Sequence, residues 1–337
     1  MHQTFYLMFS KGDQIMKTKL LLALPLAALV LTGCGNRQSA EKTDFKIGIC
    51  QLGTHPALDK ATEGFMAAVK EGLGEEHVEF DLQDAAFDSG TCITINNSFV
   101  SKKVDLIMAN ATPALQAAYN STTTIPILGT SVTEYGIALD LKNFDQTKGT
   151  GENVSGTSDL APLAEQAQMI KDVFPSAATV GLLYCSAEPN SLYQVGVMET
   201  ELAARGVATT RISFSDSNDL STVLSGLIDP VDVIYVPTDN TCASSAETIH
   251  SICSSHNKPV VAGEEGICAK AGAVTLSISY EVIGRKTGQM AVDILKNKAD
   301  IGKMAIQYDT NPVKKYNPTI CTELGLTPPE GYVAIEA

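Results

Sequence analysis

Apolar residues along the chain fall into short continuous runs that alternate with longer stretches of helical spacing. Short, β-rich apolar runs are typical of buried strands, and apolar residues every three or four positions are typical of helices. The first half predicts strands at 45–51, 78–82, 104–109 and 125–128, with helices at 56–73, 93–100 and 113–119. Strands that alternate with helices indicate βαβ units and a parallel sheet.

The same alternation restarts after the glycine-rich segment 149–153. Helices are predicted at 162–173, 191–205, 220–227, 241–254 and 280–297, and strands at 179–184, 207–214, 231–236, 259–262 and 273–278. A single hydrophobic core stops growing at about 250–300 residues, and this chain has 337. We therefore expect an α/β protein with two lobes of βα units, a hinge between them and a cleft at the junction.

The N-terminus carries the longest apolar run, at 20–30, preceded by Lys17 and Lys19. This run is too short to cross a bilayer, which takes about 20 residues in a helix. A basic start, a short apolar run and small residues before a cleavage point indicate a secretory signal over 1–33. Residues 1–15 precede a better start at Met16, so we interpret them as an over-extended start.

The signal ends in Leu-Thr-Gly-Cys34, which resembles a bacterial lipobox. In such a sequence the cysteine receives fatty acyl chains such as palmitate and becomes the first residue of the mature protein. The small and polar residues of 34–44 then indicate a flexible tether to the membrane. The alternative is an unlipidated signal that ends in cysteine by chance.

The composition of the chain argues against nucleic acid as a partner. With 24 Lys and Arg against 38 Asp and Glu, the net charge is −14, and such a chain repels phosphate backbones. Tryptophan is absent and aromatic residues make up 6%, so a stacking surface for single strands is not expected either. We expect no binding of nucleic acid.

Seven cysteines follow Cys34, and an odd number cannot all pair within the chain. Most lie in apolar stretches and none has C-x-x-C spacing, so we favour buried free thiols. His250, Cys253 and His256 recur every third residue, but on a helix they spread apart and no fourth ligand is evident. We expect neither a metal site nor a cofactor.

Polar residues gather after the predicted strands, where ligands of open parallel sheets bind. These loops are 54–59, 111–114, 130–135, 186–191, 237–240 and 263–266. Several precede helices, whose first N–H groups attract anions such as a carboxylate. Taken singly, each loop can also be explained as a helix N-cap, for which Ser, Thr, Asp and Asn are preferred. That six such loops fall at strand ends favours a binding site.

The loops also carry a resemblance. The stretches concerned are His55-Pro56-Ala57-Leu58-Asp59, 111–118, 126–133, 151–159, 184–191, 231–240, 263–266 and 279–291. In this order, behind a lipobox, the chain resembles the tryptophan/tyrosine-type substrate-binding lipoproteins of ABC transporters. The resemblance extends from about residue 45 to 326. It departs where family members often have Asp-Pro after Val-Thr, because this chain has Glu134-Tyr135 there.

The resemblance implies the type I periplasmic-binding-protein architecture, with three crossovers near 153–158, 275–280 and 306–313. Lobe one would then comprise 45–152 and 280–308, and lobe two 153–279 and 309–337. It implies an extracytoplasmic, lipid-anchored monomer that captures an amino-acid-like ligand, in several relatives an aromatic one. The ligand would pass from the cleft to ABC permease subunits in the membrane.

An α-amino acid brings one carboxylate and one ammonium, and burying either charge unpaired costs several kcal/mol. We expect Thr112, Ser131 and Thr133 to meet the carboxylate, because they fall at helix starts and loops of lobe one. We expect Asp239 to meet the ammonium, with Glu188 or Glu264 as less favoured partners. The full candidate set is His55, Asp59, Thr112, Ser131, Thr133, Tyr184, Glu188, Asn190, Ser191, Asp239, Asn240, Glu264 and Tyr280.

Three other classes compete with a transport role. The chain shows no phosphate-binding loop, no G-x-G-x-x-G and no G-x-S-x-G, so we predict that it is not an enzyme and name no catalytic residue. A ligand-sensing repressor would have a helix-turn-helix where this chain has its lipobox. A receptor that presents its ligand to a membrane sensor stays open, since the sequence does not separate it from an importer component.

Overall fold

The computed structural model describes residues 44–336. The predicted signal at 1–33, Cys34 and nearly all of the predicted tether therefore lie outside the described residues. Within 44–336, no helix is both long and apolar enough to span a membrane.

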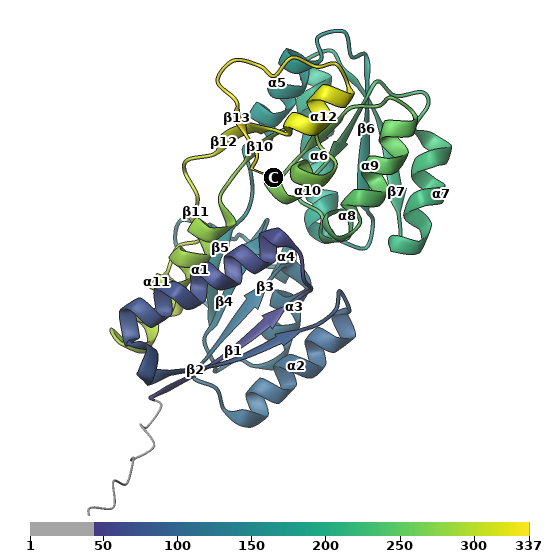
Figure 1. The fold of residues 1–337 in the computed structure, drawn as a ribbon. Coiled ribbons are helices and arrows are strands. Elements are labelled where there is room, and N and C mark those ends of the chain that lie inside the picture. The colour runs from purple at the N-terminus through teal and green to yellow at the C-terminus, as the bar shows by residue number, and fades with distance from the viewer. Residues whose placement is uncertain (1–43, 337) are drawn as a thin grey trace, which may run out of the picture. The chain divides into compact units, whose positions relative to one another are not determined.

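The first sheet and the helices packed on it form the first lobe (Figure 1). Its six strands are all parallel, in the order β11 (Gln307–Tyr308), β5 (Val154–Ser158), β4 (Ile127–Val132), β3 (Leu106–Asn110), β1 (Phe45–Gln51) and β2 (Val78–Asp84). Its helices are α1 (Pro56–Leu73), α2 (Ser89–Lys102), α3 (Thr112–Ser121), α4 (Tyr135–Leu139) and α11 (Tyr280–Leu295), with 3-10 turns η1 (Glu75–His77) and η2 (Ile301–Lys303).

The second sheet and its helices form the second lobe. Its strands follow the order β13 (Val333–Ala334), β12 (Val313–Tyr316), β10 (Val274–Ser277), β9 (Val260–Ala262), β8 (Val233–Val236), β6 (Thr179–Cys185) and β7 (Ala208–Phe214). Strand β12 runs antiparallel to β10, and the five strands from β10 to β7 are parallel. The helices are α5 (Leu163–Val173), α6 (Pro189–Ala204), α7 (Ser217–Leu227), α8 (Asn240–Ser244), α9 (Ala246–Ser255), α10 (Glu265–Lys270) and α12 (Pro318–Glu323).

Helix starts follow from local chemistry. Pro56 stands at the first position of α1, where its fixed φ suits a helix and its missing N–H costs nothing. The side chains of Asp88, Asp216 and Ser279 accept backbone N–H bonds at the starts of α2, α7 and α11. These caps fix where each of these three strand-to-helix loops ends.

Helix α11 follows β10 of the second sheet but packs on α1 in the first lobe (Figure 1). The two helices approach closely at Gly284, where an added Cβ would lie 2.1 Å from the carbonyl oxygen of Ala61. Phe65 of α1 and Met290 of α11 pack with Ile47 of β1 in one buried apolar cluster. The chain therefore returns to the first lobe through a contact that only a residue without a side chain permits.

The chain passes between the sheets three times, after β5, after β10 and after β11. This confirms the predicted fold class of two parallel-sheet lobes joined by three segments. Strand β5 follows residue 152, where we expected the second lobe to begin, yet it pairs with β4 of the first sheet. The first passage therefore comes after Ser158 rather than at 153, because β5 completes the first sheet before the chain leaves it.

Several element boundaries differ from the sequence prediction by a few residues, and two of the differences have a clear structural form. Strand β4 continues to Val132 instead of ending at residue 128, because the polar Thr130 finds a partner in the hydroxyl of Thr157 on β5, at 3.1 Å. The predicted helix 241–254 is two helices, α8 and α9, that meet at Ser245. Elements α4, α10, α12, β11 and β13 are short, and their patterns gave no prediction.

The seven described cysteines are all buried, as predicted, and their thiols are free. Cys50 lies on β1 and Cys92 on α2, in one core cluster of the first lobe. The thiols therefore contribute apolar volume to both cores.

Candidate functional site

The loop after β1 brings the first lobe against the second. His55 precedes α1 in an extended conformation and its side chain makes no capping bond to that helix. Its ring reaches Asn240 instead, with 3.3 Å between Nε2 and Oδ1. Since Asn240 follows β8, this bond joins the carboxyl ends of strands in the two sheets.

The lobes also face each other at a second place, across a narrow gap that has no room for a water molecule. Its lining includes Thr112 of α3 and Glu134 from the first lobe, and Asn190 and Tyr193 of α6 from the second. Thr112 and Asn190 are both buried. The structure thus brings together two predicted site residues that are 78 positions apart in the sequence.

Glu188 is held entirely by its own lobe. Its Oε1 accepts the backbone N–H and the hydroxyl of Thr241, at 2.9 and 2.8 Å. Its Oε2 accepts the backbone N–H and the side-chain N–H of Asn240, at 3.0 and 2.8 Å, and a bond from Asn190 at 3.1 Å. With five donors, this carboxylate orders the loop before α8.

Asp239 is likewise saturated. Its Oδ1 accepts the backbone N–H of Cys242 at 2.8 Å, and its Oδ2 accepts the backbone N–H of Cys185 and the hydroxyl of Ser191, each at 2.7 Å. Burial, with the nearby charge of Glu188, raises the pKa of Asp239 to about 7. The oxygens of the predicted ammonium partner are therefore occupied by the cap of α8, by the last residue of β6 and by Ser191 of α6.

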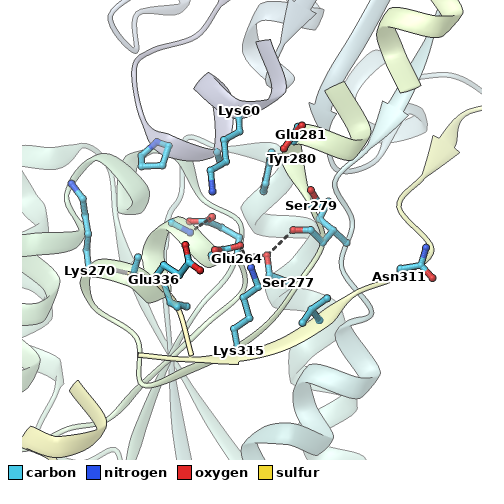
Figure 2. A pocket seen from close by; sticks show the side chains of 18 residues that line it. Lys60, Glu264, Lys270, Ser277, Ser279, Tyr280, Glu281, Asn311, Lys315 and Glu336 are labelled. Atoms are coloured by element: carbon cyan, nitrogen blue, oxygen red, sulfur yellow. Dashed lines mark hydrogen bonds and ion pairs between the residues drawn. The ribbon is translucent and has the colours of Figure 1, made fainter. Parts of the chain in front are cut away.

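Glu264 caps α10, where its carboxylate accepts the backbone N–H groups of Gly266 and Ile267. Burial raises its pKa to about 7. Glu264 lines a cavity of about 360 Å³ that also borders Lys60, Tyr280 and Lys315. Figure 2 shows these side chains around that cavity.

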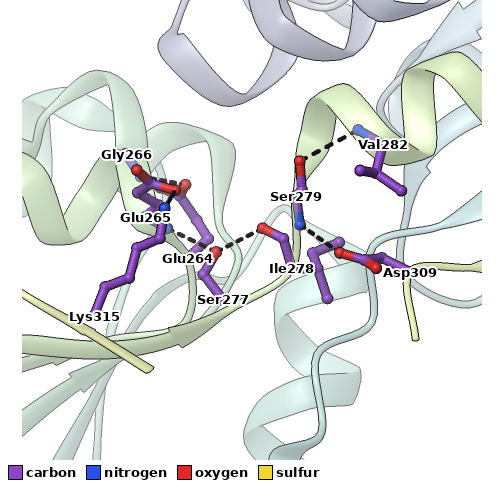
Figure 3. A network of polar contacts seen from close by, with 9 residues as sticks. All are labelled: Glu264, Glu265, Gly266, Ser277, Ile278, Ser279, Val282, Asp309 and Lys315. Carbon is purple, nitrogen blue, oxygen red and sulfur yellow. Dashed lines mark hydrogen bonds and ion pairs between the residues drawn. The ribbon is translucent and has the colours of Figure 1, made fainter. Parts of the chain in front are cut away.

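The network beside this cavity ties the crossing segments together (Figure 3). The backbone N–H of Ser279 donates to Asp309 at 2.8 Å, which links the second and third passages between the sheets. Ser277 accepts the N–H of Glu265 at 3.1 Å, and Lys315 pairs with Glu265 at 2.6 Å. These bonds hold the start of α10 against β10 and β12, beside the segments that cross between the sheets.

Asp159 is the buried carboxylate that the sequence-based candidate set omits. It follows β5 and is 3% exposed. Its Oδ1 accepts the hydroxyl of Thr133 at 2.9 Å, and its Oδ2 accepts the hydroxyl of Tyr280 at 3.1 Å. Burial raises its pKa to about 6. Two hydroxyl bonds leave about half of a carboxylate's acceptor positions open.

Polar atoms without a hydrogen-bond partner mark the same region. Among the described residues, they include Nδ1 of His55, Oγ of Ser131, Oδ1 of Asn190 and Oγ1 of Thr238, all buried. Buried polar atoms are nearly always bonded, because each unmet bond costs about 1–3 kcal/mol. Three of these four belong to the predicted set, and such atoms are suited to meet a polar ligand.

Other predicted residues lie apart. Asp59 accepts a 2.7 Å bond from Gln51 and faces a separate cavity with Thr62 and Asp84. Tyr184 packs in the apolar core of the second lobe. Their contacts with a ligand stay predictions.

Glu134 and Tyr135, which stand where family members often have Asp-Pro, contact their own lobe. Glu134 caps α4 by accepting the N–H of Gly136 at 3.1 Å, and Tyr135 is buried with its hydroxyl donating to the carbonyl of Thr157 at 3.0 Å. The ring fills the space over Gly129 and Gly156, where an added Cβ would meet its hydroxyl oxygen at 2.5 and 2.4 Å. Tyr135 thus supports the sheet beneath the site.

Asp159 and Thr238 are the residues that sequence reasoning missed. Asp159 falls in a polar stretch after a strand, which is the signal that identified the other loops. The resemblance places a crossover near 153–158, whereas the structure has strand β5 there, and Asp159 therefore follows a strand that the sequence pattern does not predict. Thr238 lies in the predicted loop 237–240, where the neighbouring Asp239 is the residue expected to bind the ligand.

His250 and His256 pair separately, with Glu323 at 3.5 Å and Asp229 at 2.9 Å. Within residues 44–336, no group of three or more His, Cys, Asp or Glu side chains is arranged to hold a metal ion.

A two-lobed α/β protein with unpaired polar atoms where its strand ends meet has the architecture of a solute-binding protein. The family model for ABC transporter substrate binding proteins matches residues 46–336, and the chain belongs to this family.

Relatives agree with that assignment. A tyrosine-binding protein of Clostridioides difficile strain R20291 is 36% identical over 301 residues, which is 85% of this chain and 86% of the relative. The structure of an ABC domain from Streptococcus pneumonia in complex with L-Trp is similar with a TM-score of 0.82, at 29% identity, covering 87% of this chain and 100% of that one. The ligand-free, open structure of a substrate-binding protein with adhesive properties from Clostridium difficile has a TM-score of 0.67, at 35% identity, covering 87% and 99%. The resemblance stated from the loops is thus confirmed.

Proposed function

We propose that this chain is the extracytoplasmic receptor of an ABC importer and binds an aromatic amino acid between its lobes. The ligand class rests on the relatives, one of which is a tyrosine-binding protein and another of which was solved with L-Trp. The observation that carries the proposal for this chain is Asp159, a buried carboxylate with open acceptor positions among unpartnered polar atoms.

The ammonium of the ligand would bind Asp159. A buried carboxylate without a cation is unfavourable, which is why burial raises the pKa of Asp159. An ammonium supplies three N–H donors and a positive charge, and both favour the ionised carboxylate. Glu188 and Asp239 lack this opening, because backbone and hydroxyl donors of their own lobe already fill them.

The carboxylate of the ligand would bind in the first lobe. The hydroxyl of Ser131 is buried and unpartnered, and Thr112 is the first residue of α3. A helix start offers free N–H groups and a favourable dipole to an anion. Asn190 and Thr238 would complete the contacts from the second lobe, so that a bound ligand favours the state in which the lobes are together.

The remaining parts of the proposal concern the membrane. We propose that Cys34 carries acyl chains, that the body is monomeric and lies outside the cytoplasmic membrane, and that it delivers its ligand to permease subunits. Intact-mass analysis of membrane-extracted protein tests the anchor, and a mass without acyl chains would remove it. Uptake of labelled ligand after deletion of the cognate permease separates import from sensing.

Titration calorimetry with L-tyrosine and L-tryptophan tests the ligand class directly. We expect micromolar or tighter dissociation constants, which correspond to about −8 kcal/mol. L-Alanine and L-aspartate, which share the α-amino and α-carboxyl groups but have no aromatic side chain, serve as controls. Binding of neither aromatic amino acid would refute the proposed ligand class.

A further inference from the structure

The turn between β2 and α2 contains two consecutive non-glycine residues in the left-handed region, Ala86 at φ 51° and Phe87 at φ 63°. Such backbone is unfavourable and persists where surrounding contacts impose it. Here the N–H of Ala86 donates to Asp84 at 2.6 Å, and the N–H of Phe87 donates to the carbonyl of Leu52 at 2.7 Å. Asp84 also accepts the hydroxyl of Thr54 at 2.8 Å. The turn is therefore fastened to the loop that precedes α1.

These bonds place the Phe87 ring over that loop. The ring lies so close to Gly53 that an added Cβ there would approach it to 2.5 Å. It stacks on the imidazole of His55, with 6.2 Å between ring centroids and 13° between ring planes. Phe87 is 38% exposed and His55 is 7% exposed, so the phenylalanine covers the histidine from the solvent side.

The partner of His55 fixes which nitrogen carries its proton. Asn240 donates its side-chain N–H to Glu188 at 2.8 Å, so its Oδ1 is the atom that faces His55. A carbonyl oxygen only accepts, and Nε2 of His55 must therefore be protonated. In the neutral ring Nδ1 is then a bare acceptor, and this atom is buried without a partner.

We propose that Phe87 is a positioning residue for an interlobe latch, because it holds the His55 imidazole in the orientation that bonds Asn240 of the second lobe. The latch rests on the proposed function, because it joins the two lobes beside the proposed ligand site. Asp59 of α1, Glu188 before α6 and Lys270 of α10 also act on the ring, and burial lowers the pKa of His55, which keeps the ring neutral at pH 7.

Histidine-ring NMR on the ligand-free protein tests the latch first. We expect a single Nε2-protonated tautomer for His55 in the wild type and a tautomer mixture in Phe87→Ala. Phe87→Tyr keeps a ring in place and should restore the wild-type signal. Ile93→Ala, a truncation of a 51% exposed side chain on α2, is the matched control and should change nothing. An unchanged His55 signal in folded Phe87→Ala would overturn the proposal.

The release rate of L-tyrosine gives the second test. Losing one aromatic pair changes an equilibrium or rate constant by about two- to tenfold. Phe87→Ala should therefore raise the rate constant of ligand release by about that factor. In a His55→Ala background the same change should have less than about a twofold effect, because the partner of the ring is gone. Equal effects in both backgrounds would overturn the latch. Absence of tyrosine binding in the wild type would instead refute the proposed ligand, and the NMR result would still decide the latch.

Discussion

Acidic side chains of the second lobe differ from Asp159 in what surrounds them. Glu188, Asp239 and Glu264 lie at helix starts, and backbone N–H groups of their own lobe occupy their oxygens. Asp159 accepts only two hydroxyl groups and lies where the chain leaves the first sheet. Asp159 is thus the one of these four carboxylates whose oxygens bond no backbone N–H group of a helix start, and its partners are hydroxyl groups.

Replacing Asp159 by Asn should have the largest effect on binding. The change keeps the shape and the ability to accept a bond from Thr133 or Tyr280, but it removes the charge that would meet an ammonium. Losing one partner of a buried charge pair costs about 2–5 kcal/mol, so the dissociation constant for L-tyrosine should rise at least about 30-fold by calorimetry. An unchanged dissociation constant would show that Asp159 does not bind the ammonium.

Replacing Asp239 by Ala should mainly lower stability. Three donors would lose their acceptor, and a helix cap would go, at about 1–3 kcal/mol in the free energy of unfolding. Denaturant titration measures this loss, and calorimetry on the folded protein should show a smaller change in affinity than Asp159→Asn. If Asp239→Ala abolished binding with unchanged stability, the ammonium would belong at Asp239 after all.

Ser131 and Ser155 offer a matched pair of hydroxyls in the first sheet. The Ser131 hydroxyl is unpartnered, whereas Ser155 donates to the carbonyl of Met304 at 2.8 Å. Ser131→Ala should weaken ligand binding about three- to tenfold with little change in the melting temperature. Ser155→Ala should do the reverse, lowering the melting temperature while the affinity stays. The opposite assignment of effects would contradict the proposed carboxylate contact.

Acid should weaken binding by a smaller amount. The pKa of Asp159 is raised to about 6 in the ligand-free protein, and a bound ammonium would lower it by favouring the ionised form. Below pH 6 the ligand must displace a proton, so affinity should fall by up to about tenfold per pH unit as the solution becomes more acidic. Calorimetry from pH 7.5 to 5, in buffers of different ionisation enthalpy, should show proton release near pH 6. Proton uptake would contradict this.

Stability without ligand should show the opposite trend. Asp159, Asp239 and Glu264 have pKa values raised to about 6, 7 and 7, chiefly by burial. A raised folded-state pKa favours the folded protein at low pH, and this contribution is lost as pH rises through that value. The ligand-free protein should therefore melt at a lower temperature at pH 8 than at pH 5.5. A melting temperature that rises over this interval would show that other groups dominate.

The sequence predicted the two-lobed fold well, because buried parallel strands and amphipathic helices leave strong local patterns. The polar loops after the strands were also visible. His55 contacts Asn240 of the other lobe, and Thr112 and Asn190 line a narrow gap between the lobes. Periodicity does not show which donors reach a carboxylate from a distant loop. Cys185 binds Asp239 from 54 residues away, and Tyr280 binds Asp159 from 121 residues away. The roles of these two carboxylates therefore needed the fold.

The most direct measurement of the central claim compares ligands that lack one charge each. Calorimetry with L-tyrosine, tyramine and 3-(4-hydroxyphenyl)propionate should be run on the wild type and on Asp159→Asn. We expect the wild type to bind L-tyrosine best, and Asp159→Asn to lose affinity for L-tyrosine and tyramine but to change little toward the propionate. Equal loss for all three ligands, or loss for none, would contradict an ammonium contact at Asp159.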